Sequence, residues 1–393
     1  MKNRGLKVYE SLKKADFVRF RPPYTFELTF DNGANVDCIG PNNTKPCTIK
    51  FMDLSTGTYG YTGEISAGLF TRLYRKWFTP WRLEAYDNDE LIYQRDLEDV
   101  ISEEKVCISV DSNSLGDTLA WMPVIEKFRR KYDCDLYVTT FWNELLANYY
   151  PFIRFRSPGS REINTKVTFG VGWYDENDRD RHRRDPRAIS LQQVAGDILG
   201  IDVEGDLLNE SVPLTIQNTN STIDGKYVCL AMDSTANAKH WHYKDGWQKI
   251  TDYLNSIGYK VVVVQKQGTN LNGVIDKTGD IDILQRAIDI YHSDFFIGIG
   301  SGLSWLAWSL HKPVVMISGF SDPVCEFSTK NYRIINRDVC HGCFNDTSIK
   351  FDKGDWNWCP RLKDTERMFE CTKTITPEVV QAHIDDLIQN HLS

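Results

Sequence analysis

The sequence has no long hydrophobic run, and nowhere does it approach the about 18 consecutive apolar residues that a helix needs to cross a bilayer. Its first residues contain no apolar core of the kind that secretory signals carry, so we expect a cytoplasmic protein without membrane insertion. An excess of basic residues is also absent, because 46 Lys and Arg stand against 54 Asp and Glu, a formal net charge of -8. Nucleic acid is therefore not expected as a partner, since phosphate backbones are bound by concentrated Lys and Arg.

Cysteine, in contrast, is well represented, with ten residues. In a cytoplasmic chain, thiols or metal ligands are expected in place of disulfides. Four of them form a spaced set, with a C-x-x-C pair, fifteen intervening residues, a third cysteine, eleven more residues and a fourth: Cys340, Cys343, Cys359 and Cys371. This spacing predicts a tetrahedral metal site, for which zinc is the default and iron the second choice. A redox C-x-x-C pair and unrelated free thiols are the alternatives.

The first hundred residues alternate apolar and polar positions. Residues 17–21, 25–30 and 47–51 show this alternation, and turn signals such as Asp31-Asn32-Gly33 separate them. We therefore expect an N-terminal antiparallel β domain over residues 1–100. The aromatic stretch at 73–81 is interpreted as packing the core of this domain, with stacking on a sugar as the alternative.

From residue 105 onward, short apolar strands alternate with amphipathic helices, which predicts parallel sheets covered on both faces. A polar stretch at 200–225 lacks periodicity and is interpreted as a linker. In the first series we expect strands at 106–110, 135–140 and 166–171, and helices at 118–131, 142–149 and 190–199. In the second series we expect strands at 227–232, 259–265, 294–300, 313–318 and 332–336, and helices at 243–257, 281–291, 302–311 and 377–391.

This organisation predicts an α/β fold of the GT-B kind, in which two Rossmann-like domains enclose a cleft at the carboxyl ends of their strands. We assign residues 101–215 to the first, acceptor-side domain, which carries the catalytic base. Residues 216–393 form the second domain, which binds the donor nucleotide and contains the four-cysteine insert at 340–371.

The turn after the first parallel strand is the first candidate for chemistry. It reads Asp111-Ser112-Asn113-Ser114-Leu115-Gly116-Asp117-Thr118, and its Gly permits a tight entry into the following helix. Asp117 would then face the cleft, where a carboxylate acts as a general base on an attacking hydroxyl. The alternative is that Asp117 or Ser114 only caps the helix.

Two further segments have the composition of an anion site. Lys239 follows the first strand of the second series and would neutralise a diphosphate, while Trp241 either packs beside the donor or is a buried structural residue. The segment Gly298 to Ala307 combines a strand, a Gly/Ser turn and a helix start, whose exposed N–H groups favour a pyrophosphate.

Taken together, these segments resemble the heptosyltransferases of the GT-B superfamily: Ser-Leu-Gly-Asp-Thr at 114–118, Ala-Lys-His-Trp at 238–241 and Gly-Ser-Gly-Leu-Ser-Trp-Leu-Ala at 300–307. The four-cysteine set and the aromatic N-terminal β domain narrow the resemblance to the bacterial autotransporter heptosyltransferases. The segment from Asp185 to Gly200 is similar to that family as well, and the resemblance covers nearly the whole chain.

The resemblance implies transfer of heptose from ADP-heptose onto Ser and Thr hydroxyls of autotransporter adhesin passengers, and we expect inversion of the anomeric centre. It also implies a structural iron held by Cys340, Cys343, Cys359 and Cys371, and homo-oligomers of dodecameric size. By residue, it implies that Asp117 is the base and that Lys239 binds the diphosphate. The predicted donor-binding set is completed by Ser114, Gly116, Thr118, Trp241, Gly300, Ser301, Gly302, Leu303 and Ser304.

Several alternatives remain open at the level of sequence. Asp111 is a second carboxylate close to the proposed base. The acceptor could be a lipopolysaccharide core or another glycan, or the chain could be a non-catalytic sugar-nucleotide-binding protein. A sugar-nucleotide epimerase has the same architecture, but it should show more cleft carboxylates and histidines.

Overall fold

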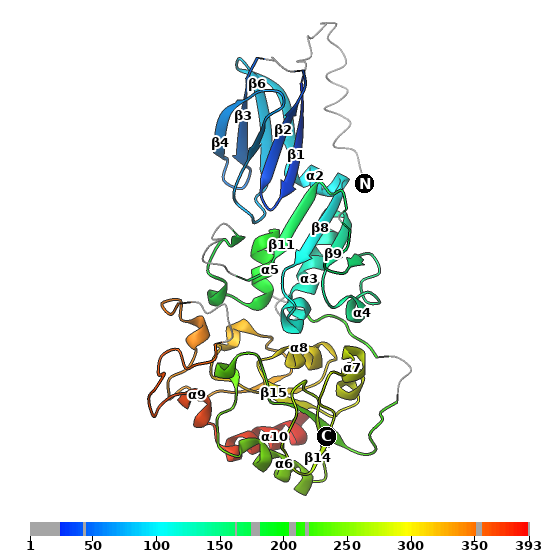
Figure 1. Cartoon of the computed structure of the whole chain (residues 1–393), viewed down its shortest axis with the longest axis vertical. Coiled ribbons are helices and arrows are strands. Elements are labelled where there is room, and N and C mark those ends of the chain that lie inside the picture. Colours follow the sequence, from blue (N-terminus) through cyan, green and yellow to red (C-terminus); the bar gives the residue numbers. More distant parts are fainter. Residues whose placement is uncertain are drawn as a thin grey trace.

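The computed structural model describes residues 24–41, 45–161, 163–173, 181–203, 210–216, 220–350 and 356–391. The molecule is elongated, with a small β-sheet at one end, a first α/β lobe in the middle and a second α/β lobe at the other end (Figure 1). The predicted strand at 17–21 and parts of the predicted linker lie outside the described residues. Among the helices that are described, none has the length and apolar character needed to cross a membrane.

The first lobe is built on a sheet that has seven strands in the described part of the chain. Across the sheet these are β10 (Arg154–Arg156), β9 (Asp135–Thr139), β8 (Lys105–Val110), β11 (Val167–Val171), β1 (Thr25–Asp31), β2 (Ala34–Ile39) and β5 (Phe70–Arg72). The first five are mutually parallel, and β2 and β5 continue the sheet in antiparallel pairing. The N-terminal strands therefore extend the sheet of the first lobe across the domain boundary predicted near residue 100.

The pairing of β1 with β11 explains this continuity. Phe30 of β1 lies opposite Val167 of β11, and its ring is 4.4 Å from that of Phe169. Alternate residues of β1 are buried, because its apolar face packs with the core of the first lobe. A strand with this pattern gains more by joining an existing sheet than by remaining in a small separate one.

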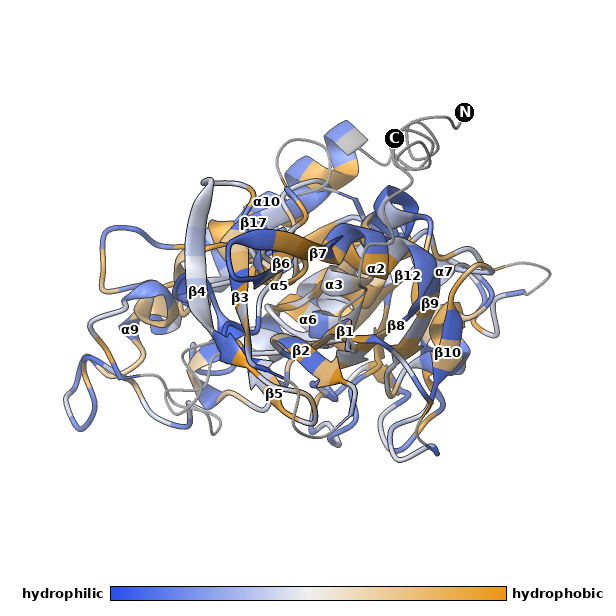
Figure 2. Ribbon diagram, turned by 90° about the horizontal axis from the view of Figure 1, so that it is seen from above, coloured by the Kyte–Doolittle hydropathy of each residue, from blue (hydrophilic) through white to orange (hydrophobic). Residues whose placement is uncertain are grey.

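The remaining N-terminal strands form a four-stranded antiparallel sheet among the described residues. In order these are β4 (Thr58–Ile65), β3 (Cys47–Asp53), β6 (Trp81–Asp87) and β7 (Glu90–Asp96). β4 lies at the outside of this sheet and is mostly pale in Figure 2, in keeping with its largely exposed residues. Of the aromatic stretch, Trp81 is buried and packs on Phe51, as predicted for the core of this sheet, whereas Phe78 packs on Tyr132 of the first lobe and Tyr74 is exposed.

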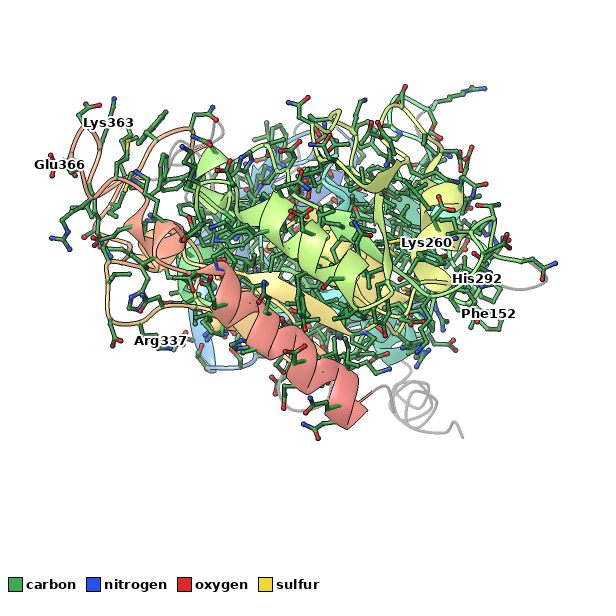
Figure 3. The ribbon with its side chains drawn as sticks, turned by 90° about the horizontal axis from the view of Figure 1, so that it is seen from below. Phe152, Lys260, His292, Arg337, Lys363 and Glu366 are labelled. Atoms are coloured by element: carbon green, nitrogen blue, oxygen red, sulfur yellow. The ribbon has the colours of Figure 1, made fainter. Side chains whose placement is uncertain are left out.

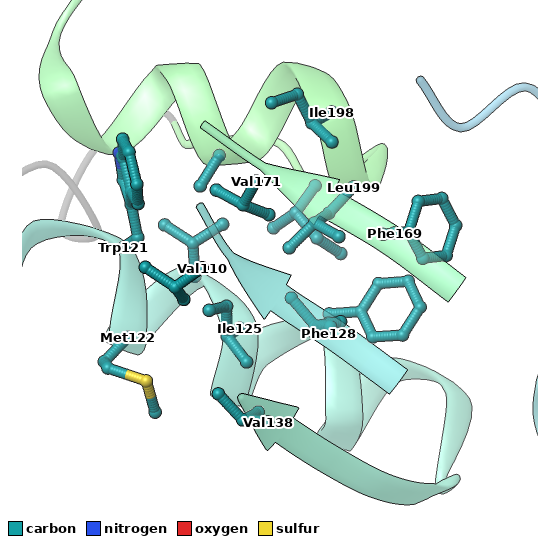
Figure 4. Packing of buried hydrophobic residues seen from close by; sticks show 14 of the residues in the cluster. Val110, Trp121, Met122, Ile125, Phe128, Val138, Phe169, Val171, Ile198 and Leu199 are labelled. Atoms are coloured by element: carbon teal, nitrogen blue, oxygen red, sulfur yellow. The ribbon is translucent and has the colours of Figure 1, made fainter. Parts of the chain in front are cut away.

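The helices of the first lobe are α2 (Leu97–Glu103), α3 (Leu115–Tyr132), α4 (Asn143–Leu146) and α5 (Leu191–Leu199), with a 3-10 turn, η3 (Pro186–Ala188). α3 starts at Ser114, whose hydroxyl accepts from the backbone N–H of Asp117 at 3.4 Å, an ordinary N-terminal cap. Side chains of α3 and α5 meet those of β8, β9 and β11 in one apolar core (Figure 4).

The second lobe contains a parallel sheet with six strands in the described residues. In order these are β14 (Val274–Asp276), β13 (Lys260–Val263), β12 (Tyr227–Ala231), β15 (Phe296–Ile299), β16 (Val314–Ile317) and β17 (Asn331–Ile334). Its helices are α6 (Gly246–Ser256), α7 (Ile283–Tyr291), α8 (Gly302–Ser309), α9 (Glu370–Lys373) and α10 (Pro377–His391), and its 3-10 turns are η5 (Asn237–Lys239), η6 (Pro323–Cys325) and η7 (Cys343–Asn345). Viewed from below, α10 crosses this end of the molecule beside α6 (Figure 3).

The predicted alternation of strands and helices is confirmed in both lobes. Seven strands were not predicted, namely β2, β4, β5, β6, β7, β10 and β14. β10 and β14 have three residues each, too few to show an apolar pattern of their own.

Candidate active site

Two helix N-termini meet between the lobes. A Cβ atom placed on Gly116 of α3 would lie 3.1 Å from Trp305 Cδ1 and 3.4 Å from the Cα of Gly302, which begins α8. A Cβ on Gly302 would lie 3.1 Å from that of Leu115. Glycine at both positions therefore permits the close approach of the two helices. Because helix N-termini present unpaired N–H groups and partial positive charge, this contact brings together two ends that attract anions.

Two hollows adjoin this contact. The first, here called the cavity, is lined by Ser114, Gly116, Asp117, Trp173, Pro186, Ile189, Leu191, Lys239, Gly300, Ser301, Gly302, Trp305, Ser321, Cys325, Glu326 and Phe344. The second, here called the groove, has a volume of about 770 Å³ and runs between α4 and the loops that follow β12, β13 and β14. The residues common to both hollows are Ser114, Lys239, Ser301 and Gly302. We call this shared region the junction.

Asp117 lies in the first turn of α3 and lines the cavity. Its Oδ2 accepts hydrogen bonds from Ser112 Oγ at 2.6 Å and from Trp173 Nε1 at 2.7 Å. Burial raises the pKa of the Asp117 carboxyl, while the two hydrogen bonds and the charge of Lys239 oppose that rise. A buried carboxylate with a raised pKa is well placed to take up a proton.

Asp111, the alternative base, is engaged elsewhere. Its Oδ2 lies 2.9 Å from Arg181 Nη2, and Ser109 donates to its Oδ1 at 2.8 Å. Its side chain lines neither the cavity nor the groove. Of the two carboxylates, only that of Asp117 lines the cavity.

The junction has the chemistry of an anion site. Lys239 ends η5 and reaches both hollows, and its ammonium makes no salt bridge with a carboxylate in the described segments. The hydroxyl oxygen of Ser301, the N-cap of α8, is buried and has no hydrogen-bond partner among the described residues. A cation and an unpaired hydroxyl beside two helix N-termini suit a diphosphate.

Some residues of the predicted donor-binding set lie elsewhere. The side chains of Thr118 and Ser304 are buried and donate to the backbone carbonyls of Ser114 and Ile299 within their own segments. Trp241 donates to the carbonyl of Ile375 at 2.9 Å and belongs to the apolar core of the second lobe. These three side chains line neither hollow, whereas Leu303 lines the groove.

Sequence reasoning missed several residues that line these hollows. Trp173 comes two residues after β11, a neighbour of β8 in the sheet, so its position at the carboxyl edge was a usable signal. The segment 265–267 likewise follows β13 and lines the groove. Glu326 and Phe344 could not be found in this way. They lie at the 3-10 turns η6 and η7 of the second lobe and not directly after a strand.

The four predicted metal ligands come from neighbouring segments. Cys340, Cys343 and Cys359 share an apolar cluster with Phe320 and Trp356, and Cys371 packs beside Gly319. Burial and the other thiolates raise the pKa of Cys343 and of Cys371 to about 12. No group of three or more ligating side chains in the described residues is close enough to hold a metal ion, so the predicted ligand set is not assembled. Four thiols, of which those of Cys343 and Cys359 are buried, nevertheless form a donor set that fits a thiophilic metal.

Arg187 links the cysteine segment to the first lobe. Its guanidinium is buried, pairs with Asp185 at 2.9 Å and donates to the backbone carbonyls of Asp346, Thr347 and Ile349. In return, Asn345 Nδ2 donates to the carbonyl of Arg187 at 2.7 Å. The two lobes are therefore joined beside the cavity by a charged hydrogen-bond network.

A groove, a junction suited to an anion and a buried carboxylate between two α/β lobes are the features of a glycosyltransferase. The family described as glycosyltransferase family 9 (heptosyltransferase) matches residues 201–350. The chain is 36% identical over 353 residues to the autotransporter heptosyltransferase BAHTCr of Citrobacter rodentium, covering 86% of this chain and 84% of the relative. It is 34% identical over 365 residues to the autotransporter heptosyltransferase Aah of Escherichia coli, covering 89% of this chain and 90% of the relative.

The solved structures agree with this comparison. The crystal structure of TibC from enterotoxigenic E. coli, described as an iron-containing dodecameric glycosyltransferase, has a TM-score of 0.84 and 32% identity, covering 95% of this chain and 98% of that one. A second TibC structure is a complex with ADP-D-beta-D-heptose, with a TM-score of 0.83. The chain belongs to the autotransporter heptosyltransferases. A further relative from Burkholderia thailandensis, 29% identical over 350 residues, is called an inactive autotransporter heptosyltransferase.

Proposed function

We propose that this protein transfers heptose from ADP-heptose onto serine and threonine hydroxyls of an autotransporter passenger, with inversion of the anomeric carbon. The observation that carries the proposal is the meeting of Asp117, Lys239 and the N-termini of α3 and α8 where the groove opens into the cavity. The choice of donor and acceptor is supported by the names of the relatives and by the ADP-heptose complex of TibC.

The two hollows suit the two parts of the donor. The groove, at about 770 Å³, lies within the range of roughly 300–1,000 Å³ that small-molecule and cofactor sites occupy, and the cavity is much smaller, about 110 Å³. We therefore propose that the nucleoside occupies the groove and the heptose the cavity. The diphosphate between them would lie at the junction, against Lys239, the Ser301 hydroxyl and the helix N-termini.

The reaction follows from this placement. Ser112 and Trp173 both donate to Oδ2 of the Asp117 carboxylate, so we propose that Oδ1 takes the proton of the acceptor hydroxyl. The acceptor oxygen forms a bond to the anomeric carbon while the bond to the ADP oxygen breaks on the opposite side, which inverts the centre. Lys239 and the N–H groups of α8 stabilise the charge that the departing diphosphate gains. Fixed donors of this kind contribute roughly 3–4 kcal/mol each to lowering the barrier.

The test is transfer by the purified full-length protein. Incubation with ADP-heptose and an autotransporter passenger fragment should add heptose masses to serine- or threonine-containing peptides. Asp117→Asn should lower transfer by about 10²–10⁴-fold, the usual contribution of a general base, and should leave the Kd for ADP within about twofold. Asp111→Asn is the matched control and should retain activity. Retained transfer in Asp117→Asn, or transfer to a lipopolysaccharide core but not to protein, would refute the proposal.

We also propose that Cys340, Cys343, Cys359 and Cys371 hold iron. Their thiol donor set supports this, as does the description of TibC as iron-containing, whereas nothing in the relatives supports zinc. When bound, the metal would supply a structural cross-link between three segments of the second lobe and would not contact the reacting groups. Like TibC, the protein is proposed to form a dodecamer, and its free cysteines favour a cytoplasmic location.

A further inference from the structure

The cavity contains a second carboxylate, that of Glu326, which the transfer mechanism does not use. Glu326 follows η6, and its side chain is only 7% exposed. Its Oε2 accepts from Arg333 Nη2 at 2.5 Å, and its Oε1 accepts from Ser321 Oγ at 3.1 Å. Arg333 is 8% exposed, so the two form a buried ion pair.

The carboxylate lies against the backbone of the donor-binding loop. A Cβ atom placed on Gly300 would overlap Glu326 Oε1, and the next nearest atom beyond this carboxyl group is Ser321 Oγ at 3.8 Å. Gly300 immediately precedes Ser301 and Gly302 of the junction. Glycine at 300 thus leaves room for Oε1 at the wall of the cavity, directly beside the place proposed for the diphosphate.

Burial of an ion pair is costly, and apolar residues of similar volume often serve stability at least as well. Stability alone therefore gives little reason for a carboxylate here. Most of the surrounding wall is apolar, with Trp173, Ile189 and Phe344 among its residues. A sugar ring in such a site needs acceptors for its hydroxyl protons, because a buried hydroxyl without a partner is unfavourable. Oε1 carries a lone pair beyond the one that Ser321 uses.

We propose that Glu326 is a specificity-determining residue that accepts hydrogen bonds from hydroxyl groups of the donor sugar. The inference rests on the proposed function, since it assumes that the cavity holds the sugar of a nucleotide-sugar donor. Glu326 is distinct from the base: Asp117 approaches the cavity from α3 of the first lobe, and Glu326 from η6 of the second. Ser321 and Arg333 position the Glu326 carboxylate.

The experiment compares Glu326→Gln with the unmodified protein by calorimetric binding of ADP-heptose and of ADP, and by kcat/KM for transfer. We expect the unmodified protein to bind ADP-heptose more tightly than ADP. In Glu326→Gln this preference and kcat/KM should fall by about 10–100-fold, the effect of one hydrogen bond to a charged group, while the Kd for ADP stays within about twofold. An ADP-heptose analogue that lacks the contacted hydroxyl should bind to the unmodified protein more weakly than ADP-heptose does. To Glu326→Gln the analogue and ADP-heptose should bind equally well.

Two further variants keep the inference falsifiable. Glu326→Asp retains the charge but withdraws the carboxylate from Gly300, and should show a smaller loss of the same kind. Ser293→Ala is the control, because Ser293 is also a buried serine of the second lobe, donates to the carbonyl of Ile290 at 2.7 Å and lines neither hollow, and it should keep the full preference for ADP-heptose.

The inference is wrong if Glu326→Gln keeps the preference for ADP-heptose over ADP. It is also wrong if Glu326→Gln loses affinity for ADP and ADP-heptose in parallel and has a lower Tm. Equal binding of both ligands to the unmodified protein would overturn it as well. The proposed function fails separately, if the unmodified protein prefers ADP-heptose but transfers no heptose to protein.

Discussion

Trp173 offers the sharpest test of the role assigned to Asp117. Its indole N–H donates to Asp117 Oδ2 at 2.7 Å, and Trp173→Phe would remove this donor while keeping an aromatic ring against Phe344. A hydrogen bond to a charged group contributes about 1.5–3 kcal/mol. At about 1.36 kcal/mol per pKa unit, its loss should raise the already elevated pKa of Asp117 by about one to two units.

The sign of the effect on activity follows from the role of Asp117 as a base. Only the ionised carboxylate accepts the proton, so activity rises with pH through the pKa of Asp117. In Trp173→Phe the acid limb of the kcat/KM profile should therefore move to higher pH by about one to two units. At pH values below the shifted limb, kcat/KM of Trp173→Phe should be about 10–100-fold lower than that of the unmodified protein. At higher pH the two values should become nearly equal.

The measurement is kcat/KM for heptose transfer across the pH range in which the protein remains folded. Trp308→Phe is the matched control, because Trp308 also donates one indole hydrogen bond, to Thr329 Oγ1 at 3.0 Å, and lines neither hollow. Its acid limb should coincide with that of the unmodified protein. An unchanged limb in Trp173→Phe, or an equal shift in both variants, would show that Asp117 is not the titrating base.

Two other predictions concern the cysteine segment and its attachment. Cys343→Ser should lose bound iron and have a lower Tm, as measured by metal analysis and thermal unfolding. The control Cys107→Ser, in β8 of the first lobe, should keep its iron. Equal iron in both variants would contradict the ligand assignment. Arg187→Lys should lower the free energy of unfolding by about 3 kcal/mol, because an ammonium cannot reproduce the planar hydrogen bonds that the buried guanidinium makes to the second lobe. Urea unfolding measures this change, and a difference below about 0.5 kcal/mol, the usual size of a surface effect, would contradict it.

The convergence of Asp117, Lys239 and Ser301 could be predicted from the sequence. Each follows a strand of a parallel sheet, β8, β12 and β15, so each lies at the carboxyl edge of its lobe. Where two such sheets face each other, residues at these edges come together, so no further sequence signal is needed to predict that they are close. Short-range patterns of apolar strands and glycine turns were sufficient for this part of the site.

Contacts made across long sequence distances could not be predicted in this way. β1 pairs with β11 although Phe30 and Val167 are more than a hundred residues apart, and alternation alone shows only that a strand has one buried face. Trp241 shows the opposite difficulty. Its place near Lys239 in sequence is compatible with either a donor contact or a structural role, and in the structure the side chain turns into the core and donates to the carbonyl of Ile375. In both cases tertiary packing decides the outcome: it selects the strand that pairs with β1 and the side to which the Trp241 side chain turns.

The cysteine segment is connected to the chemistry through adjacent residues. Phe344 directly follows Cys343, lines the cavity and packs against Trp173 with ring centroids 5.9 Å apart. Asn345 comes next, and its side chain bonds both the carbonyl of Arg187 and the backbone N–H of Asp322. A metal that fixes Cys343 would therefore fix the wall of the cavity and also Trp173, which donates a hydrogen bond to the Asp117 carboxylate. We therefore propose that a metal at this position would support transfer indirectly, through the rigidity that it gives to the cavity wall.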